Sequence, residues 1–378
     1  MRILHINSAR ALGGGERHLA DLANALFERG HEVYAALPAR SPLSEALNAL
    51  PAQNIFTLRL RNALDITSAL ELARLVRQHQ IEIVHAHLAR DYPLAALATK
   101  RNRHAKFIIT RHVLFPLNKL HSVTLSRVAR VIAVSRAVER ALLAQKIFPA
   151  NKINVIPNGI DFRRLNASLQ SFNREDFCRH LKIQPENPLV GTIGELKRQK
   201  GHEDFLRASA IVARKKPDAH FIIAGADTTR TGEHRTSLER LVNELQLNGR
   251  VHFTGWLDDV APLLAALDVY VSASHTESFG LAMVEAMAAG LPVVATATEG
   301  AREIIEREDE GVLVAVGDIE ALASSLLRLL ENPTERTRIG QLAQTSARAR
   351  FSLERMVDAT EQVYFEEQNS ESRIQESE

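Results

Sequence analysis

Two carboxylates, Glu277 and Glu285, lie eight positions apart in the segment ESFGLAMVE. The apolar run Val269–Ser272 before them predicts a strand, and residues 280–289 predict a helix that Gly290 ends. In a parallel α/β sheet, the loop between such a strand and helix is where ligands bind. The first N–H groups of the helix have no partner within it and can bind an anion. Eight helical residues span roughly 12 Å, so each carboxylate could accept hydroxyl hydrogen bonds at one end of a nucleotide sugar, with the diphosphate between them.

This segment resembles the donor site of the retaining glycosyltransferases of family 4. Members of that family carry a Glu, seven residues and a second Glu, commonly with Phe-Gly after the first. The spacing alone is also typical of solvated helices, but the flanking residues match the family in order: Ser274, Phe279-Gly280-Leu281, Glu285-Ala286 and Gly290-Leu291-Pro292. The resemblance implies that Phe279, Gly280 and Leu281 bind the donor. It also implies that Glu277 holds the transferred sugar at the catalytic centre and that Glu285 binds the ribose.

Apolar runs alternate with amphipathic helical segments along most of the chain. This rhythm predicts parallel sheets covered by helices on both faces. The alternation is interrupted by IPNGID and by a polar stretch that ends at Pro188, and it resumes after that residue. The predicted strands of the first half are residues 2–7, 32–37, 81–86, 107–110, 131–134 and 154–157. Those of the second half are residues 189–193, 220–224, 251–254, 269–272, 292–295 and 311–314.

The predicted fold class is therefore α/β, with two Rossmann-like βα domains facing a cleft. The resemblance implies the same GT-B architecture, with a C-terminal helix that crosses back to the first domain. We expect an acceptor-binding domain over residues 1–170 and a nucleotide-sugar-binding domain over residues 185–350. A crossover helix over residues 351–366 and a disordered acidic tail over residues 367–378 complete the prediction.

A glycine-rich turn, LGGGERHL, follows the first predicted strand. Its spacing is not G-x-G-x-x-G, and the second strand ends in Ala-Leu-Pro without the acid that would bind a ribose hydroxyl. These two departures disfavour a nicotinamide cofactor. The resemblance implies that Gly14 and Gly15 cover the phosphates or sugar of the donor, and a plain tight turn is the alternative.

The segment GELKRQKGHEDF follows the strand predicted over residues 189–193. The family usually has an Arg and then Lys-Gly here, which neutralise the diphosphate. Lys200 and the glycine after it match, whereas Glu195 replaces the Arg. A carboxylate there must point away, hold a basic neighbour or meet a sugar hydroxyl, and Arg198 could supply the missing cation. We expect Lys200 and Arg198 to bind the donor without metal, with a surface basic loop as the alternative. No Asp-x-Asp follows a strand, which disfavours a metal-dependent fold.

Histidines mark the ends of two further predicted strands. His112 matches a Thr-x-His position where family members place a histidine near the reacting sugar, so the resemblance implies a catalytic role. His85 and His87 end the preceding strand, but His-x-His alone is a weak metal signal. In HFTGWLDDV, Thr254 and Trp256 match the family segment near the nucleotide base, with core packing as the equal alternative.

Composition limits where the protein acts. One cysteine among 378 residues excludes an internal disulfide framework and favours a reducing cytoplasm. The start MRILHINS lacks a signal-peptide core, and no apolar run is long enough to span a membrane.

Residues 1–188 hold 27 Lys and Arg against 14 Asp and Glu, a balance of +13, so the remainder of a chain of net charge +2 balances at −11. The basic half predicts an anionic partner. A membrane surface or lipid-linked acceptor fits better than nucleic acid, because no stacking platform accompanies the charges.

The resemblance thus implies transfer of a sugar from a nucleoside-diphosphate sugar to a hydroxyl of a glycan or lipid-linked acceptor, with retained anomeric configuration. The expected setting is lipopolysaccharide or exopolysaccharide assembly at the cytoplasmic face of the inner membrane, without cofactor or metal. No carboxylate is clearly placed as a covalent nucleophile, which favours front-face displacement. A sugar-nucleotide epimerase of the same fold and a non-catalytic partner subunit, with Glu195 marking a lapsed site, stay open as alternatives.

Overall fold

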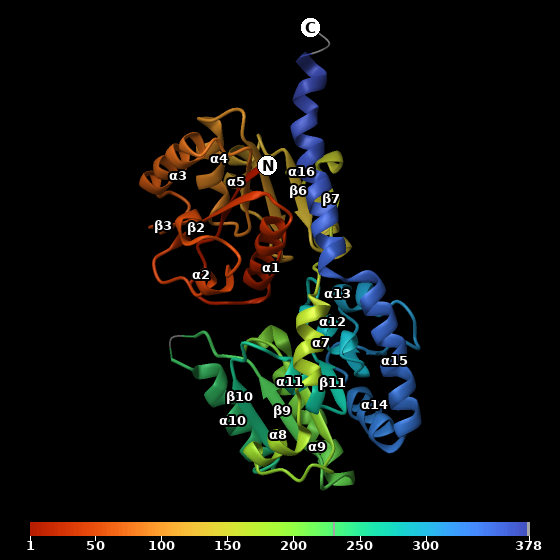
Figure 1. Ribbon diagram of the computed structural model, residues 1–378. Helices are drawn as coiled ribbons and strands as arrows, with labels where there is room; N and C mark the ends of the chain where they lie inside the picture. The colour runs from red at the N-terminus through yellow and green to blue at the C-terminus, as the bar shows by residue number, and fades with distance from the viewer. Residues whose placement is uncertain (230, 376–378) are drawn as a thin grey trace. The chain divides into compact units, whose positions relative to one another are not determined.

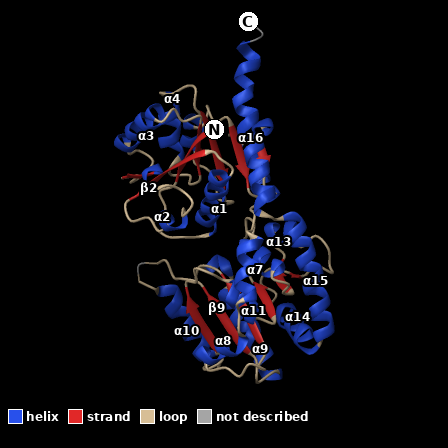
Figure 2. Cartoon of the chain, in the orientation of Figure 1, coloured by secondary structure: helices blue, strands red, loops and turns tan. Residues whose placement is uncertain are grey.

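A computed structural model describes residues 1–229 and 231–375 (Figure 1). The chain forms two compact units. The first comprises Met1–Gly159 together with the segment that begins at Leu353, and the second comprises Ile160–Ser352. Each unit has a parallel sheet with helices packed against it (Figure 2). This confirms the predicted fold class of two Rossmann-like βα domains.

The sheet of the first unit has seven parallel strands in the order β3-β2-β1-β4-β5-β6-β7. The strands are β1 (Arg2–Ile6), β2 (Glu32–Pro38), β3 (Ile55–Leu58), β4 (Ile83–Ala86), β5 (Lys106–Arg111), β6 (Arg130–Ala133) and β7 (Ile153–Val155). The sequence did not predict β3. This strand has four residues at the edge of the sheet and is only partly buried, so it lacks the continuous apolar run that marks a central parallel strand.

Six helices follow the strands of this unit: α1 (Gly14–Glu28), α2 (Leu43–Ala46), α3 (Ile66–Gln78), α4 (Tyr92–Lys100), α5 (Lys119–Thr124) and α6 (Arg136–Gln145). Short 3-10 turns, η1 (Ala52–Asn54) and η2 (Ala150–Lys152), precede β3 and β7. Helix α1 buries Leu19, Leu22 and Leu26 in the core. Asp65 and Ser135 cap α3 and α6, because their side chains accept hydrogen bonds from N–H groups in the first turn.

Helix α16 (Leu353–Gln375) returns to the first unit and packs beside α1 (Figure 1). Met356, Val357 and Tyr364 lie in the core of that unit. The prediction of a disordered tail over residues 367–378 was wrong as far as Gln375, because the helix continues to that residue. Glu367 pairs with Arg130 at 2.9 Å, and Gln368 donates to Glu82 at 2.9 Å. These contacts hold the helix at Glu367 and Gln368; residues 376–378 lie outside the described part of the chain.

The sheet of the second unit has six parallel strands in the order β10-β9-β8-β11-β12-β13. They are β8 (Leu189–Ile193), β9 (His220–Ala224), β10 (Val251–Gly255), β11 (Val269–Ser272), β12 (Val293–Thr296) and β13 (Val312–Val314). The helices are α7 (Phe162–Gln170), α8 (Arg174–Leu181), η3 (Arg198–Lys200), α9 (His202–Lys215), α10 (Glu233–Glu244), α11 (Ala261–Ala266), α12 (Leu281–Ala288), α13 (Glu299–Ile304), α14 (Ile319–Glu331) and α15 (Pro333–Arg350).

The boundary between the units differs from the predicted one. The sequence assigned residues 160–170 to the first domain, whereas α7 belongs to the second unit. Arg348 explains the difference, because its guanidinium donates to Asn166 at 2.6 Å and lies over the ring of Phe162. Among the described residues, no helix is both long and apolar enough to cross a membrane.

Candidate active site

Helix α12 is preceded by a glycine in a backbone conformation that other residue types rarely adopt. Gly280 has a φ of +110°, in the left-handed region. A Cβ at Gly280 would also lie 3.1 Å from Met283 and 3.4 Å from Glu277. Glycine therefore lets the chain turn from β11 into α12, and the first N–H groups of the helix follow directly at Leu281.

Glu277 lies just before this turn and is held by two donors. Its Oε2 accepts a hydrogen bond from Lys200 Nζ at 2.7 Å and one from Ser274 Oγ at 3.3 Å. The Glu277 side chain is 12% exposed and that of Lys200 is 32% exposed. The structure thus brings together two predicted site residues that lie 77 positions apart in the sequence.

Two glycines explain how this pair forms. Gly201 has a φ of +65°, and a Cβ there would lie 1.8 Å from the carbonyl oxygen of Ala273. The loop after β8 can therefore lie directly against the loop after β11. His275 N donates to Gln199 O at 2.8 Å and ties the same two loops together. Lys200, at the end of η3, is thereby brought to Glu277.

Gly300 supports the Glu277 loop from the other side. Its N–H donates to Glu277 O at 3.2 Å. A Cβ at Gly300 would lie 2.7 Å from Glu277 O and 2.9 Å from Phe279 O, so only glycine fits. The ring of Phe279 is buried and lies edge-on to Phe351 at 5.5 Å. The side chain of Phe279 therefore anchors the loop in the core. Sequence reasoning missed Gly300, although its place near the start of the helix after β12 was a signal.

Glu285 lies within α12 and is partly buried. Burial raises the pKa of Tyr270, and the charges of Glu277 and Glu285 raise it further. Both predicted carboxylates thus lie within electrostatic reach of one buried phenol.

Glu195 has found a basic neighbour, one of the outcomes that the sequence allowed. Its Oε2 lies 2.6 Å from Lys197 Nζ, and its Oε1 accepts a hydrogen bond from the hydroxyl of Thr228. Arg198 begins η3 and is exposed. The carboxylate in the Arg position is therefore neutralised locally, and two further cations, Arg198 and Lys200, lie on the same turn.

The other predicted donor residues of the second unit lie at the end of β10. Thr254 donates from Oγ1 to Gly255 O at 3.2 Å. Trp256 is 44% exposed, and its indole N–H donates to Asp258 at 3.0 Å. A large exposed aromatic ring beside the carboxyl end of a strand favours ligand contact over core packing for Trp256.

In the first unit, Gly14 and Gly15 form the first turn of α1. A Cβ at Gly15 would lie 3.5 Å from the ring of His112, so the helix start and the imidazole are neighbours. Burial lowers the pKa of His112 well below its usual range, and the nearby His18 lowers it further. This environment therefore favours the neutral form of the His112 imidazole.

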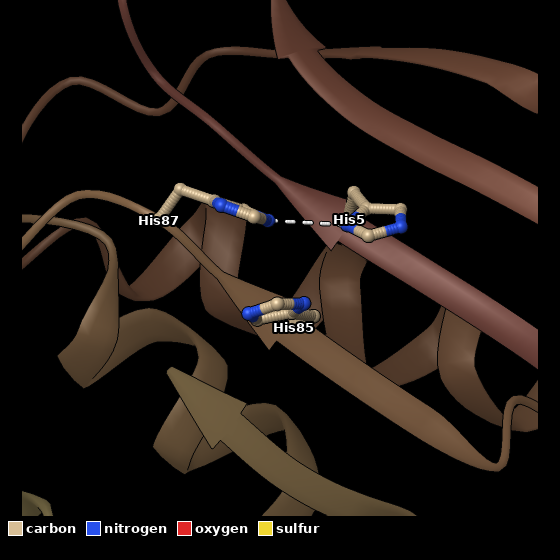
Figure 3. Close-up of side chains that lie close together, drawn as sticks. All are labelled: His5, His85 and His87. Carbon is tan, nitrogen blue, oxygen red and sulfur yellow. Dashed lines mark hydrogen bonds between the residues drawn. The ribbon is translucent and has the colours of Figure 1, made fainter. Parts of the chain in front are cut away.

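His112 belongs to a cluster with four other histidines: His5, His18, His85 and His87. His5 Nδ1 and His87 Nε2 share a hydrogen bond at 3.1 Å, and the ring of His85 lies beside them (Figure 3). Burial lowers the pKa of His5 to about 3 and that of His18 to about 4. Sequence reasoning missed His5 and His18. The register of β1 against β4, which places His5 opposite His85, would have revealed the first.

Two family models match the chain. The one described as Glycosyl transferases group 1 matches residues 173–346, and the one described as Glycosyltransferase Family 4 matches residues 12–164. The chain is 26% identical to N-acetyl-alpha-D-glucosaminyl L-malate synthase of Bacillus anthracis, with 94% of each chain covered. It is 27% identical to the lipopolysaccharide core biosynthesis glycosyltransferase LpsE of Rhizobium meliloti, with 95% of this chain and 97% of that one covered. Alr3699/HepE of Anabaena, solved with UDP and glucose, has the same fold, with a TM-score of 0.84, 23% identity and coverage of 96% and 98%.

Proposed function

Because this chain belongs to the group 1 glycosyl transferases of family 4, we propose that it transfers a sugar from a nucleoside-diphosphate sugar to a hydroxyl group, with retained anomeric configuration. The observation that carries the proposal is the arrangement around α12. Glu277 and Glu285 flank the start of one helix, and Lys200 lies beside the first carboxylate. A cation, helix N–H groups and two carboxylates are what a diphosphate between two polyhydroxylated groups requires.

Each group has a separate task in this proposal. The diphosphate accepts hydrogen bonds from the first N–H groups of α12 and from Lys200, with Arg198 as a second cation. Glu285 accepts hydrogen bonds from the ribose, and Glu277 accepts them from the transferred sugar. Thr254 and Trp256 contact the base.

We propose that the reaction needs no metal. Two cations and the helix start can offset the charge that develops on the leaving diphosphate. Glu277 is bound to Lys200 Nζ, so a donor-holding role suits it better than attack on the anomeric carbon. Retention would then follow from front-face displacement, in which the leaving phosphate helps to deprotonate the acceptor. Catalysis would rest on positioning and charge stabilisation. His112, Gly14 and Gly15 remain candidates for contact with the sugar, as the family resemblance implies.

The proposed acceptor is a glycan or a lipid-linked glycan. The similar protein LpsE is named for lipopolysaccharide core biosynthesis. The first unit also exposes Phe115 (58%) and Val123 (74%), and the side chain of Arg127, which follows them in the sequence, is exposed as well. Exposed apolar groups among basic residues suit an anionic membrane surface. We therefore propose peripheral binding at the cytoplasmic face of the inner membrane.

Product analysis with a panel of nucleotide sugars tests the function. Free nucleoside diphosphate together with a glycosylated acceptor supports the proposal, and the anomeric proton coupling of the product tests retention. An isomerised donor would instead identify an epimerase, and donor binding without turnover would identify a non-catalytic subunit. Thermal unfolding with UDP, GDP and ADP and their sugars identifies the base, because a ligand that binds the folded state raises its stability.

A further inference from the structure

The histidine cluster of the first unit contains two groups of three side chains that are close enough to share a metal ion. One ring nitrogen from each of His18, His87 and His112 lies within 4.8 Å of the others, and the same holds for His5, His85 and His87. The cluster combines the ends of β1, β4 and β5 with the first turns of α1. The proposed transfer assigns a task to His112 alone.

The two groups differ in whether their ring nitrogens already have hydrogen-bond partners. His85 is already satisfied, because Nδ1 bonds the hydroxyl of Tyr364 at 2.6 Å and Nε2 bonds that of Thr110 at 2.7 Å. A metal at His85 would have to break one of these bonds. His85 is therefore held in place by Tyr364 and Thr110, and its ring contacts those of His5 and His87, which share the hydrogen bond drawn in Figure 3.

The other group keeps buried nitrogen atoms available. His18 is 3% exposed, and neither of its ring nitrogens has a partner at normal hydrogen-bond geometry among the described residues, although the nearby Asn158 side chain raises its pKa. His87 is 2% exposed; Nε2 bonds His5, and Nδ1 has no partner within the described chain. Buried polar atoms without partners are rare in folded proteins and call for an explanation. In metal sites, the second nitrogen of a ligating histidine is usually held by a hydrogen bond, as His5 holds His87.

The three ligating atoms are imidazole nitrogens, and this chemistry determines which metal ions the site could bind. Three imidazoles suit zinc, cobalt or nickel, whereas magnesium and calcium prefer oxygen. Zn–N bonds of about 2.0–2.1 Å place the nitrogens of a tetrahedral site about 3.4 Å apart. Rotation of the rings therefore has to draw the three nitrogens together from their present separation. His112 is partly exposed and gives the ion a route from solvent.

We propose that His18, His87 and His112 bind one zinc-like transition-metal ion, and that this ion inhibits the enzyme by withdrawing His112 from the donor sugar. The inhibition rests on the proposed function, whereas the binding does not. The remaining ligand position is open to water. Because the bound ion withdraws His112, the ion regulates the enzyme, and the transfer itself proceeds without it.

Cobalt(II) titration of the chelator-treated protein tests the binding, because visible absorption of cobalt reports nitrogen ligation directly. We expect a saturable tetrahedral spectrum at one ion per chain, displaced by zinc. His18→Leu should abolish that spectrum, and His87→Gln should abolish it too, although its amide can still donate to His5. The matched control is His220→Asn. It removes a second histidine pair, in which His220 and His252 share a hydrogen bond at 3.0 Å, and should leave the spectrum unchanged.

Circular dichroism and the unfolding midpoint of each metal-free variant show whether it is folded. Absence of a saturable spectrum in the wild type, or a wild-type spectrum in folded His18→Leu, would overturn the site. Where transfer is measurable, activity should fall in proportion to cobalt occupancy and return with chelator. Full activity at saturating cobalt would overturn the inhibition and leave the binding intact. A chain that binds cobalt but transfers no sugar would contradict the proposed function, not the metal site.

Discussion

The ammonium group of Lys200 lies 2.7 Å from a carboxylate oxygen of Glu277. The two side chains come from loops after different strands, β8 and β11, and both loops lie at the carboxyl edge of the second sheet. An ammonium group has three protons, so Lys200 can keep this bond and donate to a phosphate oxygen as well. In the proposed function, the pair therefore places the cation that would bind the diphosphate next to the carboxylate that would bind the sugar.

Replacing Glu285 with Ala should weaken donor binding. A carboxylate that accepts hydrogen bonds from ribose acts in the ground state and in the transition state alike, so the Michaelis constant for the donor should rise with little change in turnover. Loss of one charged hydrogen bond should raise this Michaelis constant by roughly 10- to 100-fold. Steady-state kinetics measures both constants. Glu331→Ala, which removes an exposed carboxylate on α14, is the control. Unchanged constants in Glu285→Ala would exclude the ribose role.

Glu277→Gln should act on turnover. The substitution keeps the size of the side chain, and the amide oxygen can still accept a hydrogen bond from Lys200, but it removes the charge that binds the sugar hydroxyls, so turnover should fall by roughly 10- to 100-fold. Affinity for the bare nucleoside diphosphate should stay nearly the same, because that ligand lacks the sugar. Calorimetric titration with the diphosphate measures this affinity. A large loss would show that Glu277 contacts the nucleotide instead.

Gly300→Ala should disturb the site without touching a ligand. The added methyl would lie 2.7 Å from Glu277 O and 2.9 Å from Phe279 O, both backbone atoms that cannot yield easily. We expect a loss of about 1–3 kcal/mol in the free energy of unfolding, together with reduced turnover of the folded fraction. Denaturant titration and kinetics measure the two effects.

Gly317→Ala is the control for that variant. It adds the same methyl where no atom lies within 4 Å, at a φ of +80°. It should show backbone strain of about 1 kcal/mol and normal turnover. Equal turnover in the two variants would mean that Gly300 does not position Glu277.

The pH dependence of the second unit should carry a contribution from His202. Burial lowers its pKa to about 4. Its Nε2 donates to Glu195 O at 3.1 Å, and Nδ1 has no partner among the described residues, so an added proton would be buried unpaired. Between the folded pKa and the ordinary value of 6.5 the unfolded state binds more protons. The stabilisation is therefore complete above pH 6.5 and is lost as the pH falls toward 4, by up to about 3 kcal/mol.

His202→Gln isolates this contribution, because its amide can still donate to Glu195 O. Urea unfolding should show the wild type losing stability relative to the variant as the pH falls. A constant difference between the two across that range would contradict the prediction.

Anionic lipid should attract the first unit. Each basic residue near such a surface contributes about 1 kcal/mol, screened by salt. Co-sedimentation with anionic vesicles should be strong at low salt and weak at high salt, and Arg101→Glu with Arg103→Glu should reduce it. The exposed pair Lys215→Glu with Arg214→Glu on α9 of the second unit is the control. Equal, negligible binding to neutral and anionic vesicles at low salt would favour a soluble acceptor.

Much of the fold could be predicted because buried parallel strands have continuous apolar sequences. The predicted limits of β8, β9 and β11 coincide with the observed ones. Strand β3 was not predicted because an edge strand does not need a continuous apolar sequence. The domain boundary was misplaced because the side chain that holds α7, Arg348, lies 182 positions from its partner Asn166.

The candidate site was predictable where its residues are adjacent in the sequence. Glu277, Gly280 and Glu285 form one segment. The pairing of Glu277 with Lys200, the close packing at Gly300 and the presence of His5 and His18 beside His87 all depend on how segments far apart in the sequence meet. No local pattern encodes those contacts.

The return of α16 to the first unit has a consequence for synthesis of the chain. Residues 1–159 leave the ribosome first, but Met356, Val357 and Tyr364 of their core are translated only after the whole of residues 160–352. At about 5–20 residues per second, translation of that intervening unit takes roughly 10–40 s. Throughout this interval the nascent first unit exposes the apolar face of α1 that α16 will cover. The second unit, whose residues are contiguous, can complete its own core before the first does, although it is made later.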